Sequence, residues 1–478
     1  MSRPFPYRLG LPFVALVLAA CPMGPNFKVP ENVAVPAEWR DSTISTQDSS
    51  YANLPWWQVL GDTTLQELVR SALRENRDLR IALARVNEAR AQLGIRRLEL
   101  LPQINVGATL GTVNVNDSLL GLRTGQYGFY EVSGSISWEI DLWGRLRRLN
   151  ESAKASLLAT EYARRAAIMT VVADVARVYL ELRDLDQQTI IAQSTVQTRQ
   201  QSLDLARARF QGGLTSELDQ RQGESELARA EGRVANIRLQ AAITEQNLSF
   251  ILGRMPGTIP RGAALINQQF RTEVPPGLPS GLLTRRPDVR EAEQQLRAAN
   301  AMIGAAIAAR FPTISLTGAA GVRSDDIGNL FKAGTGFWNL ATNILLPIIN
   351  AGRSGKQVAL ERARTEAAVA RYDQVVLNAF REVENGLVSL DQLQIQVAAA
   401  VRQVAAARRA VVIAADRYQG GVDSYTTLLD AQRVLADAEL GESSLQRQQR
   451  VAVVQLYRAL GGGWDPVTDS LSLPTPAR

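Results

Sequence analysis

The chain has 478 residues, with 53 lysines and arginines against 47 aspartates and glutamates, and a formal net charge of +6 at pH 7. It contains no histidine and one cysteine. These counts exclude imidazole metal sites, histidine-based triads, internal disulfides and thiolate metal clusters, so no metal or cofactor site is expected. The basic residues are interleaved with acids and lack an aromatic platform, which indicates a solvated surface rather than a nucleic-acid interface.

The N-terminus carries the features of an export signal. Two arginines precede the apolar run Leu9–Ala20, which is too short to span a bilayer as a helix. Small residues at its end predict a signal peptide over residues 1–20. Leu18-Ala19-Ala20-Cys21 resembles a bacterial lipobox, so we predict that Cys21 carries covalent lipid and begins the mature chain. The alternative is an ordinary buried cysteine behind an uncleaved anchor.

Four stretches of the chain alternate between apolar and polar residues, which is the pattern of two-faced strands. They lie at about 102–115, 128–141, 312–323 and 336–347, and each is long enough for a tilted strand to cross an outer membrane. The segments between them, 116–126 and 323–334, are predicted to be extracellular loops, and Trp138 and Trp143 are candidates for an aromatic girdle. A soluble two-faced sheet gives the same alternation.

Four strands cannot close a barrel with a useful bore, and open strand edges cannot face lipid. Strands that span the membrane in this chain therefore predict a barrel shared between identical subunits in a closed ring.

The second half of the chain repeats the first. Residues 145–252 and 353–460 match without a gap, so that Phe210-Gln211-Gly212-Gly213-Leu214 recurs as Tyr418-Gln419-Gly420-Gly421-Val422. Each copy has an apolar seam with a period of seven, which predicts a long helix that packs lengthwise against a neighbour. The seams are Ile168, Val175, Leu182, Thr189, Val196, Leu203 and Phe210, and Val376, Val383, Leu390, Val397, Val404, Val411 and Tyr418. A Gly-Gly pair ends each helix, so each copy predicts a long antiparallel helical hairpin.

These patterns predict the following organisation. A signal peptide (1–20) precedes a lipidated N-terminal segment (21–61), a first repeat with two strands and a hairpin (62–252), a linker (253–286), a second repeat (287–460) and a C-terminal tail (461–478).

The chain resembles the TolC/OprM-type outer membrane factors, and within them the NodT-like lipoprotein efflux branch, over nearly all of its mature length. The motifs that carry the resemblance are Cys21-Pro22-Met23-Gly24-Pro25-Asn26-Phe27, Trp138-Glu139-Ile140-Asp141-Leu142-Trp143-Gly144, Arg285-Arg286-Pro287-Asp288-Val289, Phe311-Pro312, Tyr418–Arg433 and Leu460-Gly461-Gly462-Gly463-Trp464. The resemblance implies a mainly α-helical homotrimer with a 12-stranded membrane β-barrel, in which the duplicated hairpins form an α-barrel tunnel.

The resemblance also implies where this fold meets its partners. The periplasmic adaptor is expected at the hairpin tips, Gly212, Gly213 and Leu214 in the first copy and Gly420, Gly421 and Val422 in the second. The aperture of the duct is expected in the segment after the second tip. Its candidates are Asp430 and Arg433, then Thr426 and Asp423, with Asp219 and Glu217 of the first copy as a second line. Position alone favours a plainer interpretation of Asp430 and Arg433, a solvated ion pair one helical turn apart.

The predicted function is a passive channel, not an enzyme, which lets an inner-membrane proton-driven pump discharge small toxic compounds or drugs across the outer membrane through the adaptor. An exit duct for type I protein secretion has the same fold and remains an alternative. An envelope scaffold lipoprotein built from coiled coils is less consistent with two-faced strands, and the carboxylates form no recognisable catalytic motif.

Overall fold

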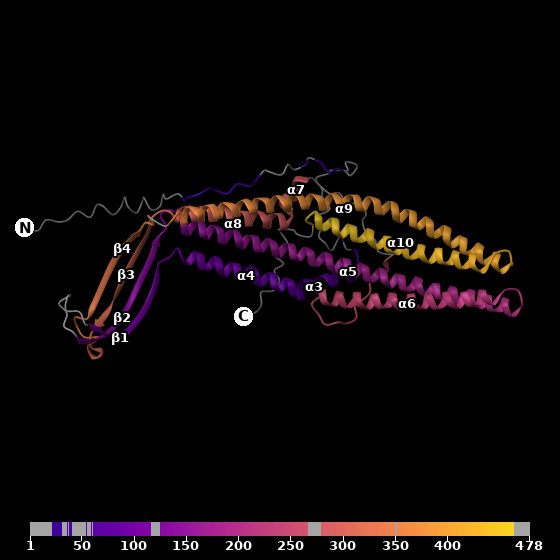
Figure 1. The fold of residues 1–478 in the computed structure, drawn as a ribbon, viewed down its shortest axis with the longest axis horizontal. Coiled ribbons are helices and arrows are strands. Elements are labelled where there is room, and N and C mark those ends of the chain that lie inside the picture. The colour runs from indigo at the N-terminus through magenta and orange to yellow at the C-terminus, as the bar shows by residue number, and fades with distance from the viewer. Residues whose placement is uncertain are drawn as a thin grey trace, which may run out of the picture. The chain divides into compact units, whose positions relative to one another are not determined.

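The computed structural model describes residues 22–30, 36, 38–40, 54, 59, 61–115, 125–265, 279–348 and 351–462. This part of the chain is mainly helical and contains one four-stranded sheet (Figure 1). None of its helices is both long enough and apolar enough to cross a membrane. The predicted signal peptide, Cys21, most of the 116–126 loop and the tail beyond 462 lie outside the described residues.

The order of elements repeats along the chain, as the sequence predicts. The elements are α3 (Thr63–Glu75), α4 (Arg77–Leu98), β1 (Gln103–Val115), β2 (Gly125–Ile140), α5 (Arg145–Gln211), α6 (Glu217–Ile251), α7 (Pro279–Arg285), α8 (Pro287–Ala308), β3 (Thr313–Ser324), the 3-10 turn η3 (Ile327–Asn329), β4 (Gly336–Leu345), α9 (Arg353–Gln419) and α10 (Tyr425–Ala459). Helices α5 and α9 both have 67 residues, and α6 and α10 both have 35. Equal lengths in both copies confirm the two helical hairpins.

The chain divides into two compact units, and each unit takes residues from both repeats. Unit 1 contains residues 85–161 and 291–373 together with the N-terminal residues up to 32, and so holds the whole sheet. Unit 2 contains residues 33–84, 162–290 and 374–478, and so holds both hairpin tips. The units therefore do not coincide with the two repeats, which follow one another along the chain.

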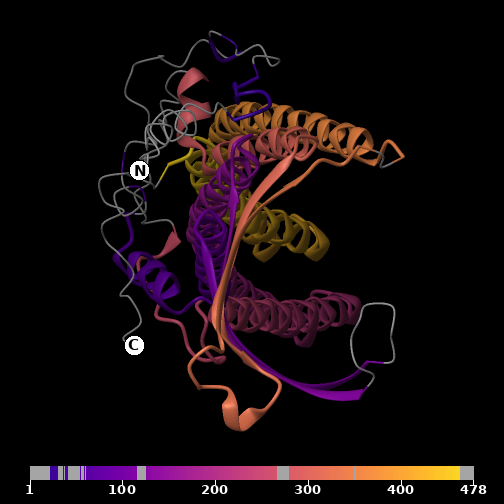
Figure 2. The same cartoon turned by 90° about the vertical axis from the view of Figure 1, so that its left-hand side faces the viewer.

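The sheet of unit 1 has one apolar and one polar face. Its strands run antiparallel in the order β1-β2-β3-β4, and both views show them side by side (Figure 1; Figure 2). Ile104 lies opposite Ile136, and Gly318 lies opposite both Ile136 and Leu340, so the apolar positions of the four strands share one face. The predicted alternation is thus confirmed in the pairing register.

The strand boundaries differ from the predicted loops at two places. Gly125 and Gln126 belong to β2 and Ser324 belongs to β3, although all three were expected in extracellular loops; Arg323, expected where the third strand meets its loop, also belongs to β3. The reason is cross-strand pairing, because Gly125 lies opposite Val115 and Arg323 lies opposite Glu131. Local turn-forming residues cannot reveal how far such a ladder extends.

The predicted seams are largely buried, and they differ at their ends. In α9, Val376, Val383 and Leu390 are buried, as are Val175 and Leu182 of α5. The last positions diverge, because Phe210 is 39% exposed whereas its repeat counterpart Tyr418 is only 2% exposed. The two hairpins therefore share a backbone plan but not one packing scheme.

Both return helices end in the same way. Gly253 follows α6 and Gly461 follows α10, with φ angles of +78° and +76° that favour glycine. The terminal carbonyl of each helix then accepts a side-chain hydrogen bond from a residue just before α4 or α8. Asn76 Nδ2 donates to Ile251 O at 2.7 Å, and Arg286 Nη1 donates to Ala459 O at 3.0 Å. These contacts account for the Leu-Gly repeats and for part of the Arg-Arg-Pro-Asp motif.

Candidate functional site

The two hairpin tips of unit 2 have matching backbone turns. After α5, Leu214 N donates to Arg209 O at 2.9 Å, and after α9, Val422 N donates to Arg417 O at 2.9 Å. Each turn places its second glycine in the left-handed region, with φ of +72° at Gly213 and +73° at Gly421. Such a helix ending satisfies the last carbonyls and reverses the chain within a few residues.

The residue after each glycine pair points away from the protein. Leu214 is 69% exposed and Val422 is 65% exposed. An apolar side chain held out on a rigid turn suits contact with a partner. The predicted tip residues therefore lie together at each turn, with Leu214 and Val422 exposed.

Asp423 is engaged within its own turn. Arg417 Nε and Nη2 donate to the two carboxylate oxygens of Asp423 at 2.6 and 3.0 Å. These hydrogen bonds lower the pKa of Asp423 and raise the pKa of Arg417. In this structure Asp423 closes the tip turn, and the first copy has no acidic residue at the matching position, which is Thr215.

Asp430 and Arg433 lie one turn apart on α10, and both side chains are more than half exposed. Arg433 Nη2 donates to Asp430 Oδ1 at 2.6 Å, which raises the pKa of Arg433. Arg433 also lies 3.6 Å from Asp437, whose carboxylate accepts from Arg233 of α6 at 3.2 Å. The pair thus belongs to a charge network, here called the α6–α10 network, that joins the two hairpins.

The same network borders a pocket of about 270 Å³ on α9 and α10. Arg433, Asp437 and Gln403 contribute polar groups to it, and Val434 and Leu445 contribute apolar ones. Thr426 lies away from this pocket at the start of α10, where its hydroxyl is 2.7 Å from Ser424 Oγ. Its contact is local, at the helix N-terminus.

The first copy presents a different charge arrangement. Glu217 accepts from Arg221 at 2.9 Å, four residues along α6. Asp219 Oδ2 accepts a hydrogen bond from the Tyr418 hydroxyl at 3.4 Å, so it links the first copy to the second tip. Burial and then the nearby Asp219 carboxylate raise the pKa of Tyr418.

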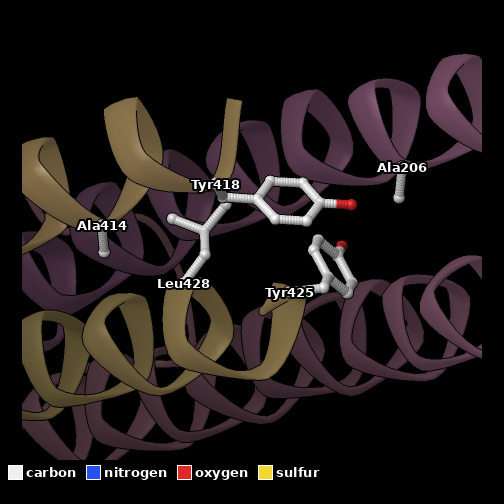
Figure 3. Packing of buried hydrophobic residues seen from close by; sticks show 5 residues of the cluster. All are labelled: Ala206, Ala414, Tyr418, Tyr425 and Leu428. Carbon is white, nitrogen blue, oxygen red and sulfur yellow. The ribbon is translucent and has the colours of Figure 1, made fainter. Parts of the chain in front are cut away.

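Tyr418, predicted as the last residue of the second seam, and Tyr425, to which the sequence assigns no role, form the core beneath the tips. Tyr418 at the end of α9 and Tyr425 at the start of α10 pack with ring centroids 5.2 Å apart. Leu428, Ala414 and Ala206 of α5 complete this cluster (Figure 3). The Arg209 guanidinium lies 5.0 Å from the centre of the Tyr418 ring, and its Nη1 donates to Gln419 O at 2.9 Å. The second tip is therefore fixed to the first.

Arg199 is a buried cation near the same region. Its Nη1 donates to Gln432 Oε1 at 2.9 Å and to Leu429 O at 3.2 Å, which ties α5 to α10. Gln432 in turn donates to Ser202 at 2.7 Å. One signal in the sequence points to this contact, because the repeat counterpart of Arg199 is Ala407. A charged residue in one copy where the other copy has a small residue marks a position where the two copies differ in partner.

Glu224 of α6 gives a pH-dependent prediction. Hydrogen bonds from Gln220, Arg207 and Arg221 lower its pKa from 4.5 to about 2. Because the folded pKa is depressed, the stabilisation by Glu224 is fully present above its ordinary pKa and is lost as the pH falls toward 2. We expect Glu224→Gln to lower the thermal unfolding midpoint at neutral pH, and this difference from the unsubstituted protein to vanish near pH 2.

Thermal unfolding followed by circular dichroism in detergent measures this difference. Glu231→Gln, which removes an exposed carboxylate from the same helix, is the control. A midpoint difference for Glu224→Gln that stays constant down to the lowest pH would contradict the pairing.

The family model described as "Outer membrane efflux protein" matches residues 68–254 and 278–462. The toluene efflux pump outer membrane protein TtgC of Pseudomonas putida is 35% identical over 465 residues, which cover 95% of both chains. The cation efflux system protein CusC of Escherichia coli is 33% identical over 458 residues, which cover 95% of this chain and 99% of CusC. In structure, the open state of the MtrE outer membrane channel of Neisseria gonorrhoeae matches with a TM-score of 0.83 at 33% identity, over 93% of this chain and 98% of MtrE.

Proposed function

This chain belongs to the outer membrane efflux protein family, and from that membership we propose that it is a passive duct for small toxic compounds or drugs. Its relatives are outer-membrane channels of efflux systems rather than enzymes, and the chain is an outer-membrane efflux channel of this kind. The duct needs no cofactor, because the energy for transport comes from a pump in the inner membrane. The observation that carries the proposal is a four-stranded sheet with one apolar face and two open edges.

The open edges support an assembly of three chains. The outer strands β1 and β4 have no further neighbour within the described sheet, and unpaired strand backbone is costly in lipid. Two chains would give eight strands, a barrel that side chains fill. Three chains of four strands give twelve, which leaves room for a lumen. We therefore assign a homotrimer, with the apolar face toward lipid and the polar face toward the lumen.

The exposed apolar residues of the sheet fit this orientation. Val106, Trp338, Leu340 and Ile344 are all exposed on the apolar face of the single chain. The opposite face carries Glu131, which accepts from Arg323 at 2.6 Å. Lipid would cover the first set and water in the lumen would solvate the second.

Efflux channels of the outer membrane work with a periplasmic adaptor and an inner-membrane pump. We assign adaptor contact to the two tips, because Leu214 and Val422 are apolar, exposed and held by rigid turns. The substrate is selected by the pump in this proposal. Two relatives with similar identity to this chain are named for cargo as different as toluene and cations. This is consistent with a duct that does not select its substrate.

The gate is assigned to the α6–α10 network. In a trimer, three Asp430 carboxylates brought toward one axis would repel one another and attract cations. Arg433 would restrain them by its ion pairs with Asp430 and Asp437. Cys21 is assigned as the site of acylation, which would add a lipid anchor next to the sheet.

Two measurements test the assembly and its function. The mass of the detergent-solubilised protein, corrected for bound detergent, is expected to equal three chains. Deletion of the protein from its bacterium is expected to increase sensitivity to toxic compounds, and re-expression is expected to restore resistance. A stable monomer or dimer would overturn the shared barrel, and a four-chain mass would replace the ring of three.

A further inference from the structure

The motif that follows Cys21 forms a strap in unit 1, defined here as residues 22–27. Met23 N donates to Trp143 O at 3.1 Å, and Asn300 Nδ2 of α8 donates to Pro25 O at 3.1 Å. The Phe27 ring lies 5.6 Å from the Arg297 guanidinium, also on α8. A segment with no helix or strand of its own is therefore held at several points along its length.

Arg148 of α5 is the centre of this attachment. Its side chain is only 3% exposed, yet it carries a full charge. Nε donates to Met23 O at 3.0 Å, and Nη2 donates to Gly24 O at 3.2 Å and to Asn26 Oδ1 at 3.0 Å. Its Nη1 donates to Glu151 at 2.8 Å. Most of the donors of this guanidinium are thus directed at the strap. Leaving the donors of a buried guanidinium unpaired would be costly.

Glycines allow the strap to pack this closely. Gly24 has a φ of +93°, and a Cβ built on it would overlap the Cα of Gly304 in α8. A Cβ on Gly304 would lie 2.6 Å from Met23 O and 2.8 Å from Arg148 Nε. The strap therefore joins α5 of the first repeat to α8 of the second through contacts that permit no larger side chain.

The strap begins where the sheet meets the helices. Trp143, which binds Met23 through its carbonyl, lies between β2 and α5. Its ring stacks on Phe311 at 4.8 Å, and its Nε1 donates to Pro312 O at 2.8 Å, in the link between α8 and β3. Pro22 is next to Cys21 in sequence, and one residue spans at most about 3.6 Å. The residue that follows Cys21 is thus held close to the base of the sheet.

We propose that the Arg148-clamped strap fixes the acylated N-terminus at the base of the sheet, so that the acyl chains lead the sheet into the lipid leaflet. This inference rests on the proposed function, in which Cys21 is acylated and the sheet crosses the membrane. An N-terminus without these strap contacts would still carry its lipid, but the lipid would have no fixed position relative to the strands. The partner of the strap is thus a lipid surface, and Arg148 is a positioning residue for it.

Surface labelling of Lys332 tests this role. Lys332 lies between η3 and β4, and the other lysines of the sequence, Lys28, Lys154 and Lys356, are periplasmic in the proposed topology. A membrane-impermeant amine reagent applied to whole cells therefore labels the full chain at Lys332 only after the sheet has crossed the membrane. Lys332→Arg controls for the site of labelling, and intact mass of the purified protein reports acylation at Cys21.

Two variants remove the clamp in different ways. Arg148→Gln removes the charged donors, and replacement of residues 23–27 by a Gly-Ser segment of equal length removes the strap while α5 and α8 keep their sequence. We expect both to lower the Lys332-labelled fraction severalfold in a pulse–chase experiment, with the lipid mass on Cys21 unchanged. Arg90→Gln, at an exposed arginine of unit 1, is expected to label as the unsubstituted protein does.

The outcomes distinguish a failure of the Arg148 clamp from a failure of the proposed membrane topology or lipid anchor. Labelling of the strap-replaced chain at the normal rate and extent would overturn the clamp, even if Arg148→Gln reduced the helix content seen by circular dichroism. Absence of Lys332 labelling in the unsubstituted protein, or an unmodified Cys21, would instead overturn the proposed topology or anchor.

Discussion

Replacing Arg286 by alanine is expected to destabilise the helical core of unit 2 by about 3–5 kcal/mol, the usual cost of removing one member of a buried charge network. Arg286 donates to Asp288 at 3.0 and 2.6 Å and to Glu382 at 2.8 Å. It also caps Ala459 at the end of α10. The alanine variant leaves Asp288 and Glu382 without their buried cation and leaves the last turn of α10 without its cap.

The measurement is the urea dependence of helical circular dichroism in detergent, compared with that of Arg285→Ala. Arg285 is the neighbouring arginine, is only partly buried, and provides the matched loss of one positive charge. We expect a small shift of the unfolding midpoint for Arg285→Ala and a large one for Arg286→Ala. Equal shifts would show that the Arg286 network stabilises the fold no more than a surface charge does.

The second large effect concerns conductance. We expect Arg433→Ala to raise single-channel conductance severalfold, because it removes the cation that restrains the Asp430 and Asp437 carboxylates on α10, while Asp437 keeps its bond from Arg233 of α6. Asp430→Ala is expected to reduce the preference for cations, because it removes the charge that would line the narrowest part of the duct. Both effects should shrink in 1 M salt, where the screening length falls to about 3 Å.

Planar-bilayer recordings decide between a gate and a solvated ion pair. Arg408→Ala is a matched control, because Arg408 pairs with Glu439 at 2.8 Å on the same hairpin and is also exposed. Unchanged conductance and selectivity in the Asp430→Ala, Arg433→Ala double variant would mean that the pair is an ordinary helix contact. The constriction would then have to be sought elsewhere, for example at Asp219.

The fold could be predicted from the sequence because its signals are local and periodic. A seam with a period of seven specifies each long helix, and Gly212-Gly213 and Gly420-Gly421 specify the turns by the left-handed conformation that glycine allows. Strand alternation likewise predicted which residues share a face. The ends of β2 and β3 were less predictable, because pairing between strands extended them into segments rich in turn residues.

The contacts of the candidate site could not be predicted in this way, because they join residues far apart in sequence. Nothing near Tyr418 indicates that its hydroxyl reaches Asp219, and nothing near Arg148 indicates that it binds residues 23–26. A period places a residue on a face of a helix but does not name the side chain opposite. Comparison of the two repeats recovers part of this information, as the exchange of Arg199 for Ala407 illustrates.

The equal helix lengths of the two hairpins have a consequence for stoichiometry. In the proposed ring of three chains, six tips of nearly the same backbone would alternate around the axis. A partner that contacts only the turn and its exposed Leu214 or Val422 would find six quasi-equivalent binding sites. The side chains behind the turns differ between the two copies, because Ser225 occupies the position in the first copy that Arg433 occupies in the second. In that proposed ring, the duplicated turns would present six similar contact points, whereas the gate residues of the second copy would occur only three times.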